Sequence, residues 1–111
     1  MKNKPIEISV EIAKKKINSD VLFVDVREEY ELQETAYAIP NIVNIPLSQF
    51  EKRFSELPKD RDLVMLCRRG RRSLIATEFL LNQGFSKVVN MQGGILERID
   101  AGFPVRSEKY N

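Results

Sequence analysis

Short apolar runs rich in β-branched residues alternate along this chain with segments whose apolar positions recur at helical spacing. The runs at 21–24 (Val-Leu-Phe-Val) and 63–66 (Leu-Val-Met-Leu) are continuous, which is typical of strands covered on both faces. The pattern predicts strands at Ile6–Ile8, 21–24, 43–45, 63–66 and 87–91, and helices at 10–17, 28–33, 47–57, 73–83 and 95–101. This alternation favours an α/β fold in which helices cover both faces of a sheet.

Two of the predicted helices carry further signals. Ser48 and Glu51 have the spacing of a capping box, which would begin the third helix. The helix at 73–83 has a wide apolar face that includes Ile75 and leaves Thr77 among its few water-facing positions. We therefore expect this helix to be largely buried.

Length and charge narrow the class of protein. A chain of 111 residues with 42% hydrophobic content suits one compact domain spanning residues 1–111. The net charge of +2 comes from 18 basic and 16 acidic side chains, and four of the basic ones are arginines within segment 68–72. Without those four the balance is 14 basic against 16 acidic, so the positive charge is local. This distribution disfavours nucleic acid and membrane partners and favours a small anion bound at one spot.

Composition also limits the available chemistry. With one cysteine and no histidine, the chain has no internal disulfide, no imidazole base and no metal cluster of the usual ligand types. We therefore expect neither a metal nor another cofactor, and any nucleophile must be activated electrostatically. The N-terminal residues lack the apolar segment of a signal peptide, and no apolar stretch reaches the roughly 18 residues of a membrane span, so we expect a cytoplasmic protein.

The single cysteine, Cys67, ends the fourth predicted strand and opens the segment Arg-Arg-Gly-Arg-Arg before the next helix. Unpaired backbone N–H groups, the positive end of the helix dipole and four arginines favour a thiolate over a thiol at such a position. Gly70 supplies the positive φ that a tight anion-binding ring requires. Most lone cysteines are small buried apolar residues, but four arginines form a poor apolar wall. Cys67 is therefore predicted to be a nucleophile.

Five short motifs in order resemble a single-domain rhodanese, a sulfurtransferase of the rhodanese-like superfamily. They are Asp25-Val26-Arg27-Glu28, the Ile-Pro-Asn-Ile-Val-Asn-Ile-Pro segment at 39–46, Leu57-Pro58-Lys59-Asp60, the active loop from Cys67 to Ser73, and Gly93-Gly94-Ile95. The resemblance implies a five-stranded parallel sheet flanked by helices and a persulfide carried on Cys67. Three residues depart from the family pattern: Ala38 where histidine is frequent, Asn41 where glycine is frequent, and Arg98 where tryptophan is common.

The predicted reaction begins with attack of the Cys67 thiolate on the outer sulfur of thiosulfate, which releases sulfite and leaves a persulfide. A thiol or cyanide then accepts the sulfur. The substrate-binding group is expected to comprise Arg68, Arg69, Gly70, Arg71, Arg72 and Ser73. The family geometry implies that Arg72 is the most inward arginine and that Arg68 or Arg69 lies at the rim.

Three supporting residues have expected roles. Ser73 either caps the following helix, the preferred interpretation, or donates a hydrogen bond to the persulfide. Asp25 and Arg27 are expected to form a charged pair that braces the loop.

Two other functions compete with a thiosulfate sulfurtransferase. The first is a persulfide relay or regulatory binding module that docks on an acidic, sulfur-accepting protein. The second is phosphate-ester or arsenate chemistry, which the loop length disfavours: a phosphatase loop of the Cys-x5-Arg type requires arginine at the position of Ser73 and usually a histidine at that of Leu66.

Overall fold

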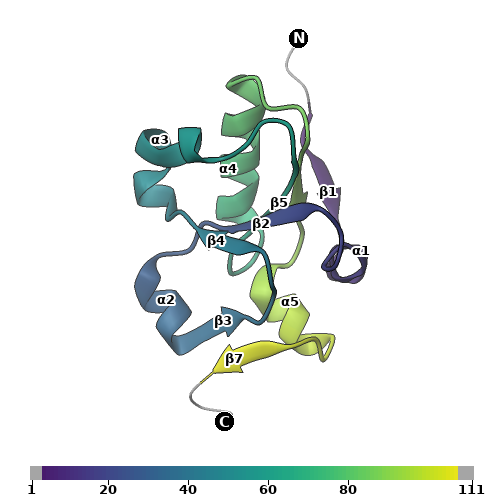
Figure 1. The fold of residues 1–111 in the computed structure, drawn as a ribbon. Helices are drawn as coiled ribbons and strands as arrows, with labels where there is room; N and C mark the ends of the chain where they lie inside the picture. Colours follow the sequence, from purple (N-terminus) through teal and green to yellow (C-terminus); the bar gives the residue numbers. More distant parts are fainter. Residues whose placement is uncertain (1–3, 108–111) are drawn as a thin grey trace.

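The computed structural model describes residues 4–107. Five parallel strands form one sheet in the order β1-β6-β5-β2-β4, and a separate antiparallel pair joins β3 to β7 (Figure 1). The strands are β1 (Ile6–Ile8), β2 (Val21–Asp25), β3 (Thr35–Tyr37), β4 (Ile42–Asn44), β5 (Asp62–Leu66), β6 (Val88–Met91) and β7 (Val105–Ser107). The α-helices are α1 (Val10–Lys15), α2 (Glu29–Glu34), α3 (Phe50–Arg53), α4 (Arg71–Asn82) and α5 (Gly94–Asp100). The predicted α/β fold with a five-stranded parallel sheet is therefore confirmed.

The central strand β5 separates two apolar cores. Leu63 and Met65 lie in a core with residues of α3 and α4, whereas Val64 and Leu66 lie in a core with residues of α1 and α5. This division follows from the alternation of side chains along a strand. Helices thus cover both faces of the sheet, and the carboxyl end of β5 delivers Cys67 to the edge where the first turn of α4 begins.

The helix predicted at 47–57 is broken into three short pieces. A 3-10 turn, η1 (Leu47–Gln49), precedes α3, and a second, η2 (Phe54–Glu56), follows it. The predicted capping box of Ser48 and Glu51 is wrong, because the Ser48 hydroxyl donates to Glu28 Oε1 at 2.8 Å. The capping box of this region belongs instead to Glu28 and Glu31 at the start of α2.

Helix α4 is rotated relative to the face predicted for it. Thr77 is fully buried and donates from its hydroxyl to the Ser73 carbonyl at 2.7 Å, whereas Ile75 is 55% exposed. The hydroxyl of Thr77 is satisfied by the backbone within the helix, so its burial costs little. The expectation that Ile75 is buried and Thr77 is exposed is therefore wrong, and α4 presents an apolar side chain to solvent.

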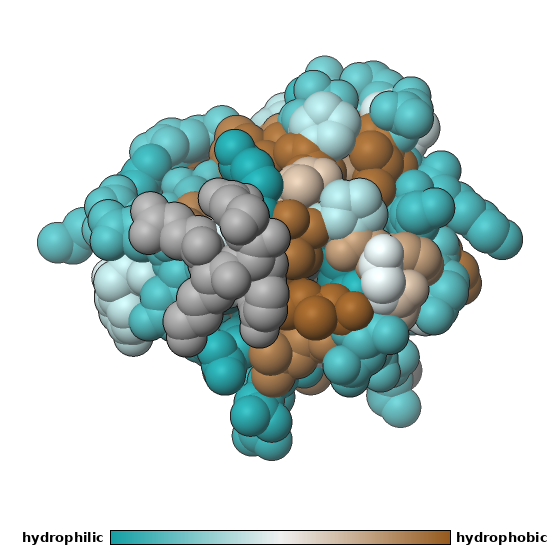
Figure 2. Space-filling model, turned by 90° about the horizontal axis from the view of Figure 1, so that it is seen from below, coloured by the Kyte–Doolittle hydropathy of each residue, from teal (hydrophilic) through white to brown (hydrophobic). Residues whose placement is uncertain are grey.

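The end of the molecule built from α2, β3, α5 and β7 is shown in Figure 2, where apolar side chains gather near the centre and hydrophilic ones surround them. On this end Ile99 is exposed, and Phe103 and Val105 are half-buried. Across residues 4–107 no helix combines the length and the apolar character needed to cross a membrane.

Candidate active site

The site is centred on the Cys67 sulfur, which lies where β5 meets α4. Cys67 is 1% exposed, and its Sγ accepts hydrogen bonds from the Gly70 amide at 3.0 Å, the Ser73 amide at 3.4 Å and the Ser73 hydroxyl at 3.2 Å. Three donors converging on one sulfur stabilise negative charge at that atom. These three hydrogen bonds, together with its place at the start of α4, make Cys67 the candidate nucleophile of the site.

Helix α4 begins two residues earlier than predicted, and this changes the interpretation of Ser73. Gly70 is the N-cap residue, with φ of +97°, so Ser73 is the third residue of the helix. Because Gly70 occupies the cap, the preferred capping role of Ser73 is wrong. Its hydroxyl instead donates to the Cys67 sulfur, the atom that would carry the persulfide in the alternative interpretation.

The loop that holds the sulfur is fixed against the Gly93-Gly94 turn. The Ile95 amide donates to the Cys67 carbonyl at 3.0 Å, and the Leu96 amide donates to the Arg68 carbonyl at 3.3 Å. A Cβ atom on Gly94 would lie 2.1 Å from the Arg68 carbonyl oxygen, and φ of Gly94 is +62°. Only glycine permits this contact between backbones.

The loop arginines form a cavity of about 270 Å³ lined by Cys67, Arg68, Arg69, Arg71 and Arg72. The first three arginines are exposed, and none of the carboxylates in residues 4–107 forms an ion pair with them. Their charge is therefore available to a small anion entering the cavity.

Arg72 is the least exposed of the four loop arginines, but its guanidinium is already bound. It forms a bidentate pair with Glu31 of α2, with Nη1 at 2.7 Å from Oε2 and Nη2 at 2.8 Å from Oε1. The hydrogen bonds from Arg72 lower the pKa of Glu31 to about 2, and the same pairing raises the pKa of Arg72. The pair is thus charged at neutral pH and fixes the loop to α2.

The expected pair of Asp25 and Arg27 is formed, at 2.8 Å, and both side chains are buried. Arg27 also donates from Nη1 to the Thr35 carbonyl at 2.9 Å, and its guanidinium lies 5.3 Å from the Tyr37 ring centre. The Tyr37 hydroxyl donates to the Cys67 carbonyl at 2.6 Å. The ion pair is therefore linked to the loop through Tyr37, which contacts Arg27 with its ring and Cys67 with its hydroxyl.

Sequence reasoning gave Tyr37 and Glu31 no role at the site. Burial, together with the nearby Asp25 carboxylate, raises the pKa of Tyr37 well above 10, so its phenol remains a donor. Tyr37 is separated from Cys67 by 30 residues and Glu31 from Arg72 by 41, and no local pattern joins them. Their partners become visible only when β3 and α2 are packed against the loop.

The three departures from the family pattern lie outside the loop. Asn41 has φ of +56°, which asparagine tolerates better than most residues where glycine is frequent. The Ala38 amide donates to the Pro104 carbonyl at 3.4 Å, and Arg98 Nε donates to the same oxygen at 2.9 Å. Burial lowers the pKa of Arg98. Ala38 and Arg98 thus both hold the segment that precedes β7.

A metal is not suggested by the side chains present. Nowhere in residues 4–107 do three or more cysteine, histidine, aspartate or glutamate side chains gather in a way that could hold a metal ion. The cavity beside Cys67 is lined by cations and therefore suits an anion.

Comparisons with known proteins agree on one family. The profile described as "Rhodanese-like domain" matches residues 9–99. A sulfurtransferase of Allochromatium vinosum is 41% identical over 86 residues, which cover 78% of this chain and 78% of that protein. YrkF, a candidate sulfur carrier protein of Bacillus subtilis, is 41% identical over 91 residues, which cover 80% of this chain and 48% of YrkF. The crystal structure of a rhodanese-related protein from Thermoplasma volcanium superposes with a TM-score of 0.82 at 33% identity, covering 91% of this chain and 97% of that one.

Proposed function

The chain belongs to the rhodanese-like family of sulfur-transfer proteins, and on that premise we propose that it moves a sulfane sulfur from thiosulfate, or a similar anionic donor, to a thiol or cyanide. The observation that carries this proposal is the Cys67 sulfur, which accepts three hydrogen bonds at the base of a cavity ringed by arginines.

In the first half-reaction the Cys67 thiolate attacks the outer sulfur of thiosulfate. The sulfur–sulfur bond of the donor breaks, its electron pair leaves with sulfite, and Cys67 becomes a persulfide. Arg68, Arg69 and Arg71 are free to attract the dianion, and the amide donors around the sulfur hold the charge of the product.

In the second half-reaction an external acceptor attacks the terminal sulfur of the persulfide. Cyanide leaves as thiocyanate, a thiolate leaves as its persulfide, and the Cys67 thiolate is restored in either case. An external acceptor is required because the chain has no second cysteine to take the sulfur.

The deciding experiment is mass spectrometry of the protein after thiosulfate treatment, with a gain of one sulfur atom at Cys67 as the expected result. Cys67→Ser is the matched control, because its hydroxyl is of similar size but is much harder to ionise. It should retain the fold by circular dichroism and lose transfer from thiosulfate to cyanide. Transfer within tenfold of the parent in this variant would refute the assignment of the nucleophile.

Salt should weaken the reaction with thiosulfate. The attraction between the dianion and exposed arginines is screened by ions, and arginine does not titrate in the working range. We expect KM for thiosulfate to rise with ionic strength. A KM that is independent of salt would contradict the role of the arginines.

A persulfide relay is the second candidate, and the similarity to YrkF favours it. The two functions differ in the acceptor. Discharge of sulfur-loaded protein should be compared for cyanide, glutathione and sulfur carrier proteins. A protein acceptor that outpaces the small thiols more than a hundredfold, about 2.7 kcal/mol of barrier, would favour the relay.

A further inference from the structure

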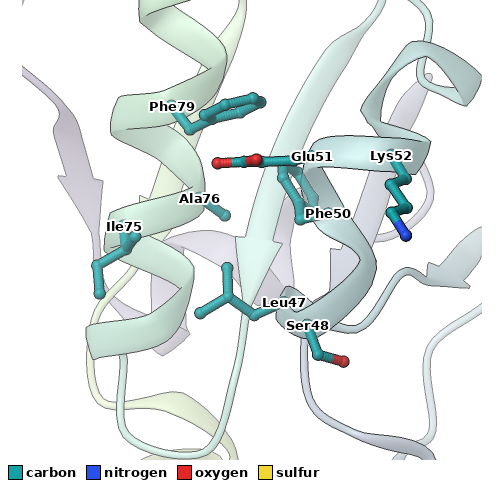
Figure 3. Close-up of a pocket in the computed structure, with 8 residues that line it drawn as sticks. All are labelled: Leu47, Ser48, Phe50, Glu51, Lys52, Ile75, Ala76 and Phe79. Carbon is teal, nitrogen blue, oxygen red and sulfur yellow. The ribbon is translucent and has the colours of Figure 1, made fainter.

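A groove runs beside the active loop between η1–α3 and α4, and neither half-reaction uses it. It has a volume of about 320 Å³ and is lined by Leu47, Ser48, Phe50, Glu51, Lys52, Ile75, Ala76 and Phe79 (Figure 3). We call it the α3–α4 groove. Its apolar floor belongs to, or packs against, the same core that contains Cys67. The groove therefore lies on the side of the sheet to which the nucleophile is turned.

The groove begins close to the mouth of the active site. Ile75 follows Arg71 by four residues of α4, about 6 Å along the helix axis. Figure 3 shows Leu47 and Ile75 toward the start of α4, with Phe79 and Glu51 farther along. An extended chain covers the roughly 12 Å from Arg71 to Phe79 with about four residues.

The charges at the two ends of the groove are opposite. At the loop end, Arg68, Arg69 and Arg71 are exposed and form no ion pair with the described residues. At the far end, the Glu51 carboxylate is directed toward α4 (Figure 3), and within residues 4–107 it has neither an ion pair nor a hydrogen bond. Between these charges, Ile75 exposes 55% of its surface.

The remaining polar groups of the groove do not alter this pattern. The Ser48 hydroxyl donates to Glu28, and the Lys52 side chain lies farther from α4 than Glu51 does and runs roughly parallel to the α4 axis (Figure 3). A ligand that matches the groove is therefore anionic at the loop, apolar in the middle and cationic at the far end. A small thiol such as glutathione offers no apolar group for the middle of the groove.

We propose that the α3–α4 groove docks an extended segment of a sulfur-accepting protein. In this segment an acidic residue adjoins the acceptor cysteine at the loop, an apolar side chain covers Ile75, and a basic side chain pairs with Glu51. The proposal rests on the sulfur-transfer function above and specifies the acceptor. A groove of this size accommodates only a few side chains, so the contact is small and transient.

Binding to unloaded protein tests the groove without any sulfur chemistry. The probe is a fluorescently labelled peptide, Asp-Ser-Gly-Leu-Lys, in which serine replaces the acceptor cysteine. Fluorescence anisotropy should detect binding by the parent and at least tenfold weaker binding by Ile75→Gln. The matched control is Ile12→Gln on α1, because Ile12 is likewise exposed, at 46%, but lies outside the groove. Equal affinity of all three proteins, or no measurable binding to the parent, would overturn the proposal.

A charge exchange tests the direction of binding. Glu51→Lys should weaken binding of the peptide, and a peptide with glutamate in place of lysine should restore it. Failure of this exchange to restore affinity would refute the pairing at the far end.

Sulfur discharge then separates the groove from the proposed chemistry. With protein loaded at Cys67, the cysteine form of the peptide should accept sulfur at least tenfold more slowly from Ile75→Gln than from the parent. Discharge to cyanide should agree within twofold. An equally slowed discharge to cyanide would show that Ile75→Gln acts through the active loop, and it would overturn the proposed docking in the groove. Failure of the parent to load with sulfur would instead count against the proposed function, while the binding result would still decide on the groove.

Discussion

The two halves of the Cys67 loop are held in place by different means. The strand half, residues 67–70, is fixed mainly by backbone: the Ile95 and Leu96 amides bind its carbonyls, and Gly94 lies directly against Arg68. The helix half, residues 71–73, is fixed by side chains, through the Arg72–Glu31 pair and the Ser73 hydroxyl. The contact of Gly94 with Arg68 leaves no room for a Cβ atom at position 94, whereas the side-chain contacts of the helix half can be altered by substitution without a shift of the backbone. The Cys67 sulfur is thus located by the backbone contacts, and the side-chain contacts adjust its surroundings.

Gly94→Ala tests the backbone half and should have the largest effect. The new Cβ would meet the Arg68 carbonyl group at 2.1–2.2 Å, and the backbone is left-handed at φ of +62°. We expect a loss of at least about 3 kcal/mol in the free energy of unfolding, together with loss of sulfur loading. Urea denaturation and mass spectrometry would measure the two effects.

The matched control is Gly102→Ala. Gly102 has φ of +78°, but nothing lies within 4 Å of an added Cβ. It should cost only the intrinsic strain of the left-handed backbone, about 1–2 kcal/mol, and leave loading intact. If both variants lost the same free energy of unfolding, the close contact between Gly94 and Arg68 would not explain the effect of Gly94→Ala.

Ser73→Ala tests the helix half at the point nearest the chemistry. The change removes the hydroxyl donor at 3.2 Å from Sγ and keeps the two amide donors. We expect sulfur loading from thiosulfate to slow about tenfold, or about 1.4 kcal/mol of barrier, with the fold intact. Stopped-flow loading kinetics would measure this, with the exposed Ser55→Ala as control. Unchanged loading in Ser73→Ala would mean that the amides alone stabilise the sulfur.

These two halves also differ in how far the sequence predicts them. The strand that carries Cys67, the positive φ of Gly70 and the double-glycine turn follow from apolar runs and short motifs, whereas the contact of that turn with the loop does not. In the helix half, Glu31 reaches Arg72 from 41 residues away, and no spacing rule relates them.

Other differences from the predicted elements have the same cause. Strands β3 and β7 are not predicted, because they form by antiparallel pairing with each other between segments far apart in the sequence, and no local pattern shows such a pairing. Ile75 and Thr77 exchange their expected environments because the packing of α4 against its neighbours overrides the apolar pattern of its sequence. Local signals therefore predict the sheet and the position of Cys67 at its edge, and tertiary contacts decide the β3–β7 pair and the side-chain partners of the loop.

Tyr37→Phe sharpens the comparison, because Tyr37 is a side chain that acts on the strand half. The change removes the hydrogen bond to the Cys67 carbonyl, but that oxygen keeps the Ile95 amide at 3.0 Å. We expect a loss of about 1 kcal/mol in the free energy of unfolding and sulfur loading within twofold of the parent. Tyr30→Phe is the control, because Tyr30 is 67% exposed, and it should change neither quantity. A tenfold slower loading in Tyr37→Phe would show that backbone contacts alone do not position the nucleophile.

Glu31→Gln should have the smallest effect on the free energy of unfolding. Its main effect should be on the KM for thiosulfate. Arg72 holds the pKa of Glu31 at about 2, below its ordinary 4.5. A lowered folded-state pKa stabilises the protein above the unfolded value, and this contribution is lost as pH falls from about 4.5 toward 2. The variant should therefore be less stable than the parent by under about 1 kcal/mol at pH 7, and the difference should shrink at pH 3.

The same change removes the negative charge opposite Arg72, so the positive charge of its guanidinium is no longer balanced and can attract the anion. We expect KM for thiosulfate to fall in Glu31→Gln while kcat stays level or decreases, because the dianion gains a cation and the loop loses a tether. Glu56→Gln is the matched control, since it removes the exposed Arg53–Glu56 pair, which is outside the cavity, and it should leave KM unchanged. A rise in KM of Glu31→Gln would mean that the Glu31 pair holds Arg72 in the geometry that binds thiosulfate. Side-chain contacts would then locate the substrate as firmly as backbone contacts locate the sulfur.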